Sequence, residues 1–370
     1  MTVCLSANGV NVHSVDAAPT RLLVATLGGV TILDRDAPGA SWRTQGLVLE
    51  GKHASALMVE PTRGGIFAGV HDGALYFSGD DGETWQQRSD GITIPHIYSL
   101  AYAPRAGGAT LYAGTEPVGL FRSDDYGRSW RDLAAIRSMP GREKWSFPGP
   151  PHVPHVKSIA VHPRDPDTVY AAVEQGGLMK STDGGTSFRE LDAYAREGDA
   201  VYHDIHRTVA LPSRPDEMFM TSGCGLYRST DAGETWEHLT TDGFRVGYPD
   251  HLVVSPRDER AMFMSGAAGN PFTWRKTGRA EGTVMRTRDG GRSWDFANRG
   301  MPPGRANVEA MGIASYPGGF SLFAGNTDGE VYCSEDGAES WTRIASGLKP
   351  VSKGAHYRLV QGAPGAAAPH

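Results

Sequence analysis

Short apolar runs, separated by turn-forming residues, make up most of this sequence. Residues 155–163 form one run that ends at a proline, and residues 168–173 form a second run after an Asp/Pro turn. Residues 177–180 and 187–191 add two more runs. Short runs rich in β-branched and aromatic residues are typical of strands. The chain has 48 glycines and 24 prolines among 370 residues for turns and no long helical periodicity, so we expect an all-β fold.

A phrase of eight residues, Ser-x-Asp-x-Gly-x-(Ser/Thr)-Trp with small variations, recurs six times along the chain. A decayed seventh copy ends at Trp42 and has Ala37 where the aspartate belongs. The six copies close at Trp85, Trp130, Phe188, Trp236, Trp294 and Trp341. All seven closing aromatics are 43 to 58 residues apart, which is the period of a four-stranded propeller blade. Within the phrase, Asp and Ser oxygens accept hydrogen bonds from backbone N–H groups of a tight turn, and Gly supplies the unusual dihedral angle.

These phrases resemble the Asp-box of the BNR/sialidase-type β-propellers (the WD40/YVTN/BNR-like group), and the resemblance covers nearly the whole chain. It implies a seven-bladed β-propeller in which each Asp-box is a structural turn between the third and fourth strands, on the face opposite the ligand site. The ring of such a family closes by pairing strands from the two termini. We expect one domain, 1–370, with blades at 11–46, 52–89, 96–134, 155–192, 204–240, 248–298 and 307–345 and a closing strand at 356–364.

Composition narrows the classes of partner and compartment. The net charge of −6 argues against nucleic acid as a partner. Three cysteines, far apart and odd in number, favour free thiols in a reducing compartment. No apolar run is long enough to span a membrane, and the first residues lack the pattern of a secretory signal. We therefore expect a cytoplasmic protein with no membrane partner; the sequence leaves its oligomeric state open.

Polar residues recur at the start of each predicted inner strand, eight positions before its proline. In a propeller these positions surround one mouth of the channel, and they are occupied by His53, His96, His155, Asp204, Tyr248, Glu309 and His356. Imidazole and carboxylate are ligands of transition metals, so the four histidines predict a site for divalent Zn, Fe, Cu or Mn. A metal-free acid/base site and a plain strand-capping role for the histidines are the alternatives. No motif for a nucleotide cofactor is found.

Three functions remain open at this point. The leading prediction is metal-assisted hydrolysis or elimination with Asp204, His206, Asp250 and Glu309 as the catalytic residues. Glu309 would help the four histidines to hold the ion, and Asp204, His206 or Asp250 would move protons. The first alternative is a metal-independent glycoside hydrolase that uses two of the carboxylates. The second is a non-catalytic scaffold for assembly or binding. A true sialidase is not expected, because no Phe-Arg-Ile-Pro segment precedes the first Asp-box.

Three loops exceed the repeat length and are expected on the same face as the channel mouth. They cover residues 137–155, 194–204 and 269–279 and carry several basic and aromatic side chains. Long structured loops are often functional. The residues expected to bind substrate are Trp145, Lys157, Tyr248, Trp274, Arg275 and Arg358. Because this face is basic on an acidic protein, an anionic small molecule is the predicted substrate.

Overall fold

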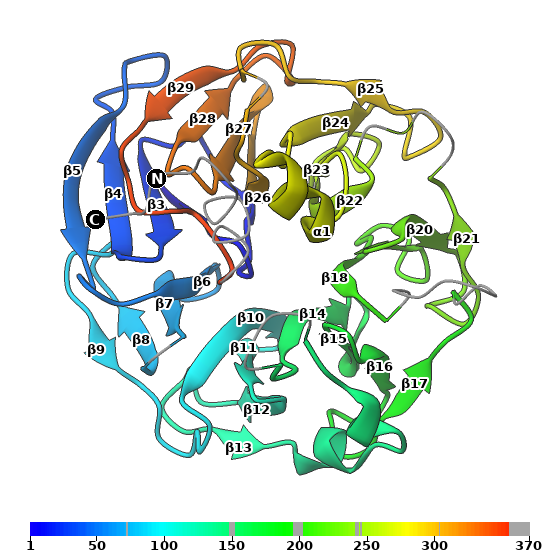
Figure 1. Ribbon diagram of the computed structural model, residues 1–370. Coiled ribbons are helices and arrows are strands. Elements are labelled where there is room, and N and C mark those ends of the chain that lie inside the picture. Colours follow the sequence, from blue (N-terminus) through cyan, green and yellow to red (C-terminus); the bar gives the residue numbers. More distant parts are fainter. Residues whose placement is uncertain are drawn as a thin grey trace. The chain divides into compact units, whose positions relative to one another are not determined.

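The chain forms seven four- or five-stranded sheets, shown in the computed structural model of Figure 1. The structure describes residues 1–71, 73–147, 152–194, 203–240, 244, 246–302 and 304–354. Each sheet is one blade, and the predicted all-β, seven-bladed β-propeller is confirmed. None of the helices in the described ranges is long and apolar enough to cross a membrane. The chain divides into two compact units, which are described separately below.

Unit 2 comprises Asn8–Val10 and Ser55–Thr240 and contains four antiparallel blades. In chain order, its strands are β6 (Ala54–Glu60), β7 (Gly65–Val70), β8 (Leu75–Ser78), β9 (Gln86–Gln87), β10 (His96–Arg105), β11 (Gly108–Glu116), β12 (Gly119–Ser123), β13 (Arg131–Asp132), β14 (Val156–His162), β15 (Asp165–Val173), β16 (Gly177–Ser181), β17 (Arg189–Leu191), β18 (Ile205–Ala210), β19 (Met218–Ser222), β20 (Gly225–Ser229) and β21 (Glu237–His238). Two short 3-10 helices, η1 (Ala134–Ser138) and η2 (Arg142–Lys144), follow β13. Aliphatic and aromatic side chains of successive blades bury one another, as at the interface of the β10–β13 and β14–β17 blades.

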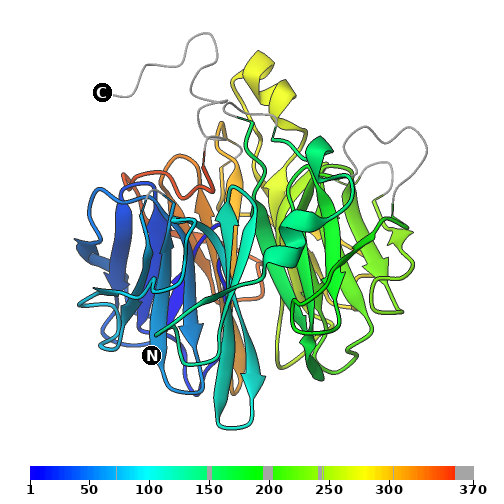
Figure 2. The same cartoon turned by 90° about the horizontal axis from the view of Figure 1, so that it is seen from below.

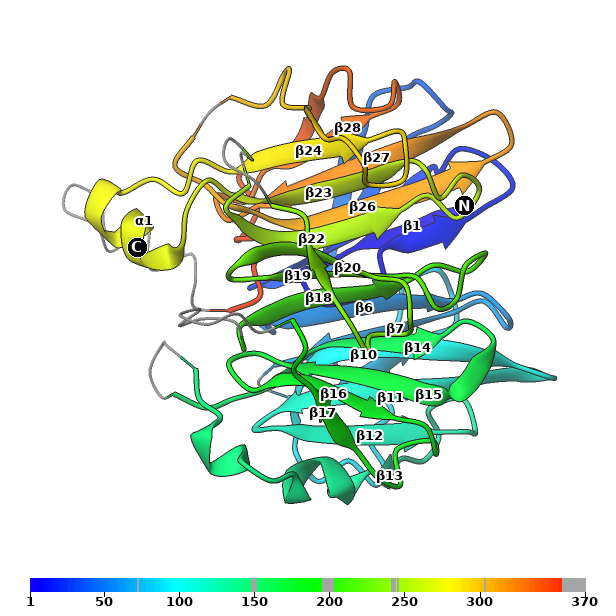
Figure 3. The same ribbon diagram turned by 90° about the vertical axis from the view of Figure 1, so that its right-hand side faces the viewer.

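Unit 1 comprises Met1–Ala7, Asn11–Ala54 and Thr241–His370 and contains three blades. Its strands are β1 (Thr2–Leu5), β2 (Val12–Ser14), β3 (Arg21–Thr26), β4 (Gly29–Asp34), β5 (Arg43–Val48), β22 (Tyr248–Val254), β23 (Met262–Ala267), β24 (Thr283–Thr287), β25 (Asp295–Phe296), β26 (Val308–Tyr316), β27 (Gly319–Asn326), β28 (Val331–Ser334) and β29 (Thr342–Ala345). One short helix, α1 (Pro271–Thr277), lies between β23 and β24. In Figures 2 and 3 this helix projects beyond the ends of those two strands.

The N-terminal strands differ from the prediction that the first blade begins at residue 11. The innermost strand of that blade is β1, which pairs in parallel with β3. Strand β2 instead pairs in parallel with β26 and becomes a fifth strand of the last blade. The buried Asn11 holds this crossing, since its Nδ2 donates to Ser6 O at 2.6 Å and to Met311 O at 3.0 Å. The predicted closing strand 356–364 lies outside the described residues.

Each Asp-box forms a turn fastened by its own side chains. In the first copy, Ser78 Oγ accepts from Gly82 N at 2.9 Å, and Asp80 Oδ1 accepts from Thr84 N at 2.9 Å. Hydrogen bonds from Thr84 lower the pKa of Asp80 to about 2, so this carboxylate remains an acceptor over most of the pH range. The same bonds recur in the other copies, for example from Gly127 N to Ser123 Oγ at 2.8 Å. This geometry agrees with the predicted role of the Asp-box as a structural turn, here called its staple role.

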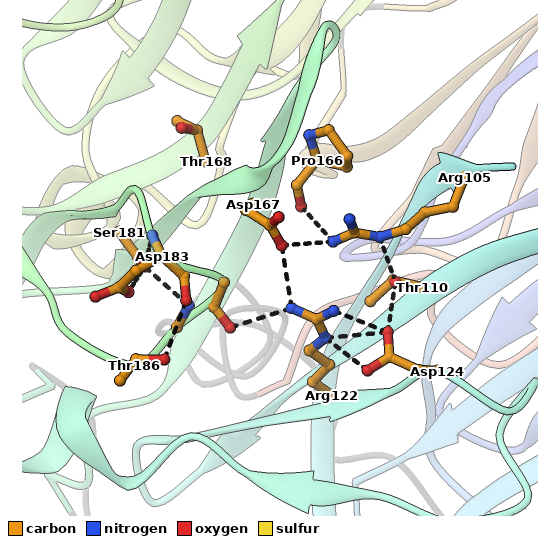
Figure 4. Close-up of polar contacts among 12 residues, drawn as sticks. Arg105, Thr110, Arg122, Asp124, Pro166, Asp167, Thr168, Ser181, Asp183 and Thr186 are labelled. Atoms are coloured by element: carbon orange, nitrogen blue, oxygen red, sulfur yellow. Dashed lines mark hydrogen bonds and ion pairs between the residues drawn. The ribbon is translucent and has the colours of Figure 1, made fainter.

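Ion pairs at the Asp-box edge of unit 2 fasten one blade to the next (Figure 4). Arg122 pairs with Asp124 of its own blade at 2.9 Å, and its Nη1 donates to Gly184 O in the Asp-box of the following blade at 3.4 Å. Asp167 accepts from Arg105 Nη2 at 2.7 Å and from Arg122 at 3.4 Å. These charges serve blade packing, and the candidate chemistry lies at the other ends of the strands.

Candidate functional site

Two groups of polar and charged residues, most of them buried, lie at strand ends away from the Asp-boxes, one in each unit. The first, here called the histidine cluster, is in unit 2 and draws on four successive blades. Its members are His71, Glu116, His155, Lys157, Glu174, Asp204 and His206. The second, here called the Lys353 cluster, is in unit 1. Its members are Asp250, Asn307, Glu309, Ser352 and Lys353.

His155 is the centre of the histidine cluster, and its side chain is fully buried. Its Nδ1 lies 3.0 Å from Glu116 Oε2, and its Nε2 lies 2.7 Å from Glu174 Oε2. The ring also stacks on Tyr98 with centroids 3.8 Å apart. Burial alone would lower the pKa of His155, but the hydrogen bonds that its ring donates to Glu116 and Glu174 outweigh burial and raise that pKa. This imidazole is therefore a cation that holds two carboxylates.

Glu174 is shared between neighbouring groups of the cluster. Its Oε1 accepts from Lys157 Nζ at 2.6 Å and lies 4.0 Å from His206 Nε2. His206 in turn lies 3.3 Å from Asp204 Oδ1. Burial raises the pKa of Asp204, yet the charge and hydrogen bond of His206 outweigh this effect and leave the pKa lowered. The cluster thus alternates carboxylates with cationic groups.

Glu174, Asp204 and His206 have the donor set of a divalent metal site. One ligand atom from each lies within 4.8 Å of the others, and all three residues are buried. Two carboxylates and one imidazole suit Zn, Mn or Fe. However, the Lys157 ammonium already sits on the same Glu174 oxygen and supplies the positive charge that a metal would bring. The donor set therefore fits a metal ion only if Lys157 moves away.

The predicted four-histidine metal set is not brought together within either unit. Both nitrogens of His155 face carboxylates, and Nδ1 of His96 is hydrogen-bonded to the backbone oxygen of His71. His53 belongs to unit 1, where its Nε2 lies 3.3 Å from Ser352 O. His356 lies outside the described residues. The metal set remains a prediction.

The Lys353 cluster brings together two of the predicted catalytic carboxylates from neighbouring blades. Asp250 lies on β22 and Glu309 on β26, and Asn307 Nδ2 donates to Asp250 Oδ2 at 2.5 Å and to Glu309 Oε1 at 3.4 Å. Asp250 Oδ1 accepts from the Lys353 ammonium, and both side chains are almost inaccessible to solvent. The two carboxylates are therefore bridged by one amide group, and Asp250 also pairs with the Lys353 ammonium.

Glu309 is held on its other side by the segment that follows β29. Its Oε2 accepts from Ser352 Oγ at 2.8 Å and from Lys353 N at 3.0 Å. Burial raises the pKa of Glu309, and the nearby Lys353 charge only partly opposes that effect. Because Oε2 already accepts two hydrogen bonds, a proton on Glu309 belongs on Oε1, the oxygen that faces Asn307.

The remaining predicted site residues occupy varied positions. Trp145 is half-buried and packs on the core between the β10–β13 and β14–β17 blades. Tyr248 and Trp274 are buried together, with ring centroids 5.9 Å apart, whereas Arg275 is exposed. Arg358 lies outside the described residues. Trp274 thus anchors α1 from inside, and Arg275 lies on the outer face of that helix.

Several residues of both clusters were not predicted from the sequence. Glu116 and Glu174 occupy the same place in the repeat, directly after Leu-Tyr-Ala-Gly-Thr and Val-Tyr-Ala-Ala-Val. His71 stands at this place in the preceding blade, and Gly223 in the following one. Aligning the second strands of the blades would have found them. Lys353 belongs to no repeat position and carries no such signal.

No family model matches the chain, so the BNR/Asp-box resemblance rests on the motif. A xyloglucanase from Paenibacillus sp is 27% identical over an alignment of 267 positions that covers 64% of this chain and 24% of the relative. A xyloglucanase, Xgh74A from Acetivibrio thermocellus, is 26% identical and is covered to 34% of its length. The chain therefore spans about a quarter to a third of the curated relatives it matches.

Two kinds of solved structure share the fold. The GH74 xyloglucanase of Xanthomonas campestris matches with a TM-score of 0.57 and 16% identity, over 78% of this chain and 45% of that one. YCF48 from Cyanidioschyzon merolae matches with a TM-score of 0.57 and 15% identity, over 88% of this chain and 95% of that one. These similarities confirm the propeller fold alone. The chemistry of the site has to be inferred from the side chains of the two clusters.

Proposed function

We propose that this protein is a metal-independent glycoside hydrolase in which Glu309 and Asp250 are the catalytic acid and base or nucleophile. One observation carries the proposal: two buried carboxylates from adjacent blades share the amide of Asn307, and the Lys353 ammonium pairs with Asp250. Glycoside hydrolysis commonly needs such a pair, one protonated and one ionised. The curated relatives, which are xyloglucanases by name, support the same class of reaction.

The surroundings of Glu309 and of Asp250 assign a catalytic role to each carboxyl group. Burial favours the protonated form of Glu309, so Glu309 Oε1 would donate its proton to the leaving glycosidic oxygen. The Lys353 ammonium keeps Asp250 ionised, so Asp250 would act on the sugar carbon directly or through a water molecule. Asn307 holds the two carboxylates at a fixed spacing. Lys353 is a positioning residue, since it acts through Asp250.

Substrate access requires a local movement. Ser352 and Lys353 cover Glu309 through two hydrogen bonds, from Ser352 Oγ and Lys353 N, and Glu309 is only 1% exposed. A sugar could reach Glu309 once Ser352 and Lys353 shift outward. The proposal therefore includes opening of residues 350–354 when substrate binds.

The test is hydrolysis of xyloglucan oligosaccharides and aryl β-glycosides by the purified chain, with and without a chelator. We expect turnover that the chelator does not change and that Glu309→Gln and Asp250→Asn each reduce by at least about 100-fold. Glu50→Gln, at an exposed carboxylate of the same unit, should keep wild-type activity. Activity that survives Glu309→Gln, or that the chelator abolishes, contradicts the proposal.

A second candidate function is a non-catalytic binding scaffold. It is favoured by the internal pairing of the charged groups, since Lys157, His155 and Lys353 each neutralise a buried carboxylate of this chain. A solved structure of YCF48 bound to D1 peptide, covered to 96% with a TM-score of 0.51, illustrates a propeller of this fold with a peptide ligand. An inert chain that forms a stoichiometric complex with a purified partner protein would favour this candidate.

A further inference from the structure

The loop between β23 and β24 carries a concentrated group of exposed cations and one exposed aromatic ring. This group, here called the α1 platform, consists of Phe272, Arg275, Lys276 and Arg279. Phe272 is 64% exposed, and the three cations are exposed as well. A protein with net charge −6 thus places three positive charges within five residues beside a bare phenyl ring.

The platform is rigidly built. The side chain of Asn270 accepts from Phe272 N and Thr273 N at the start of α1, and Gly278 ends the helix in the left-handed region with φ 68°. Trp274 is only 1% exposed, and its Nε1 donates to Gly269 O at 2.7 Å. The helix is therefore locked to unit 1 from its buried side, while its outer side carries the platform.

The buried side of α1 connects the platform to the Lys353 cluster. Trp274 contacts Tyr248 edge to face, with centroids 5.9 Å apart. The Lys353 ammonium lies 5.9 Å from the centre of the Tyr248 ring and pairs with Asp250. Three side-chain contacts in series, through Tyr248 and Lys353, therefore link Trp274 of the platform helix to Asp250 of the proposed acid/base pair.

The charges of the platform have few partners in the protein. Arg279 lies 3.6 Å from Glu281, an exposed and weak pair. Within the residues that the structure describes, neither Arg275 nor Lys276 forms an ion pair. Cations that serve stability are normally matched by nearby carboxylates, as those of the Asp-box edge are. Charge complementarity therefore selects an anionic ligand.

We infer that the α1 platform, on the blade that carries Asp250, binds the carboxylate groups of an acidic glycan, a chain that contains uronic acid sugars. Guanidinium groups bind carboxylates through paired N–H donors, and an exposed aromatic ring packs on the apolar C–H face of a pyranose. The inference rests on the proposed function, because it names the substrate class of the same site. A neutral glucan would use Phe272 alone and leave the three cations without a role.

The experiment is a binding titration of the full chain with tetragalacturonate and with its methyl ester, which has the same sugars without the charge. Arg275→Ala/Lys276→Ala should weaken binding of the acid about tenfold and hardly change binding of the ester. Phe272→Ala should weaken binding of both. Arg292→Ala/Arg299→Ala removes the same charge from exposed positions near the Asp-box end of the same blade and should leave both affinities unchanged.

Three results would overturn the inference: equal affinity for acid and ester, equal behaviour of the two double variants, or tighter binding of polyglutamate than of tetragalacturonate. The last result would identify an acidic peptide as the ligand. The Glu309→Gln variant separates the two proposals, since it removes the catalytic acid and leaves the platform intact. Binding of tetragalacturonate by a wild type that hydrolyses neither this ligand nor xyloglucan oligosaccharides nor aryl β-glycosides refutes the hydrolase alone. Hydrolysis of glycans without charge-dependent binding refutes the platform alone.

Discussion

Replacing Lys353 by methionine removes the ammonium group that faces Asp250 while retaining most of the side-chain volume. Both partners are almost fully buried, at 3% and 2% side-chain exposure. Removing one partner of a buried ion pair typically costs about 3–5 kcal/mol, because the other charge stays buried without compensation. Glu309 is a second buried carboxylate that shares the Asn307 amide with Asp250. We therefore expect the loss of stability at pH 8 to lie in the upper part of that range.

The cost should depend on pH in a defined direction. Lys353 opposes the burial effect on Glu309, so its removal raises the folded-state pKa of Glu309 further. A carboxyl group whose pKa is raised by folding stabilises the protein at low pH and destabilises it as pH rises above the unfolded value of about 4. The variant should therefore lose less stability at pH 5 than at pH 8.

Guanidinium unfolding followed by fluorescence of the eight tryptophans measures this effect. The control is the double variant Asp250→Asn/Lys353→Met, which removes both charges and should recover most of the loss, to within about 1–2 kcal/mol of the wild type. A loss below about 1 kcal/mol in the single variant, or no recovery in the double variant, would refute the assigned buried pair.

Three further predictions concern the blades. Folding raises the pKa of His155, so its stabilising contribution is complete below the unfolded value of about 6.5 and is lost as pH rises through the folded value. The unfolding free energy of the wild type should fall from pH 6 to 9 relative to His155→Asn, and parallel profiles would contradict this. Ser123→Ala removes the acceptor of Gly127 N and should lower stability by about 1 kcal/mol in a denaturant titration; an unchanged midpoint would count against the staple role. Gly223→Ala places a methyl group 2.7 Å from Asp204 Oδ2 and should lower the free energy of unfolding by about 1–3 kcal/mol. The control is Gly290→Ala, where no atom lies within 4 Å of the added methyl group but φ is 78°, so only backbone strain should lower the stability.

The repeat allowed most of the fold to be predicted from the sequence. Each Asp-box is a local structure, because its Ser, Asp and Gly satisfy the turn within eight residues, so the motif alone fixes where a blade turns. Counting back from the prolines also placed Asp204 and Glu309 at strand starts and Asp250 one layer further in, and Asp250 and Glu309 share the amide of Asn307. The path of the first fourteen residues was missed, since β2 pairs with a strand some 300 positions away.

The sequence by itself determined the all-β repeat, the number of blades and the residue types at the strand ends, because these depend on hydrogen bonds and periodicities within one blade. Only the tertiary structure decided which charges are neighbours. His155 lies between carboxylates of two different blades, and Asp250 pairs with Lys353, 103 positions later, which belongs to no repeat. Such pairs form where blades pack together, because a buried charge without a partner of opposite sign is energetically costly. The residues of these pairs do not recur with the period of the blade, so the repeat does not reveal them.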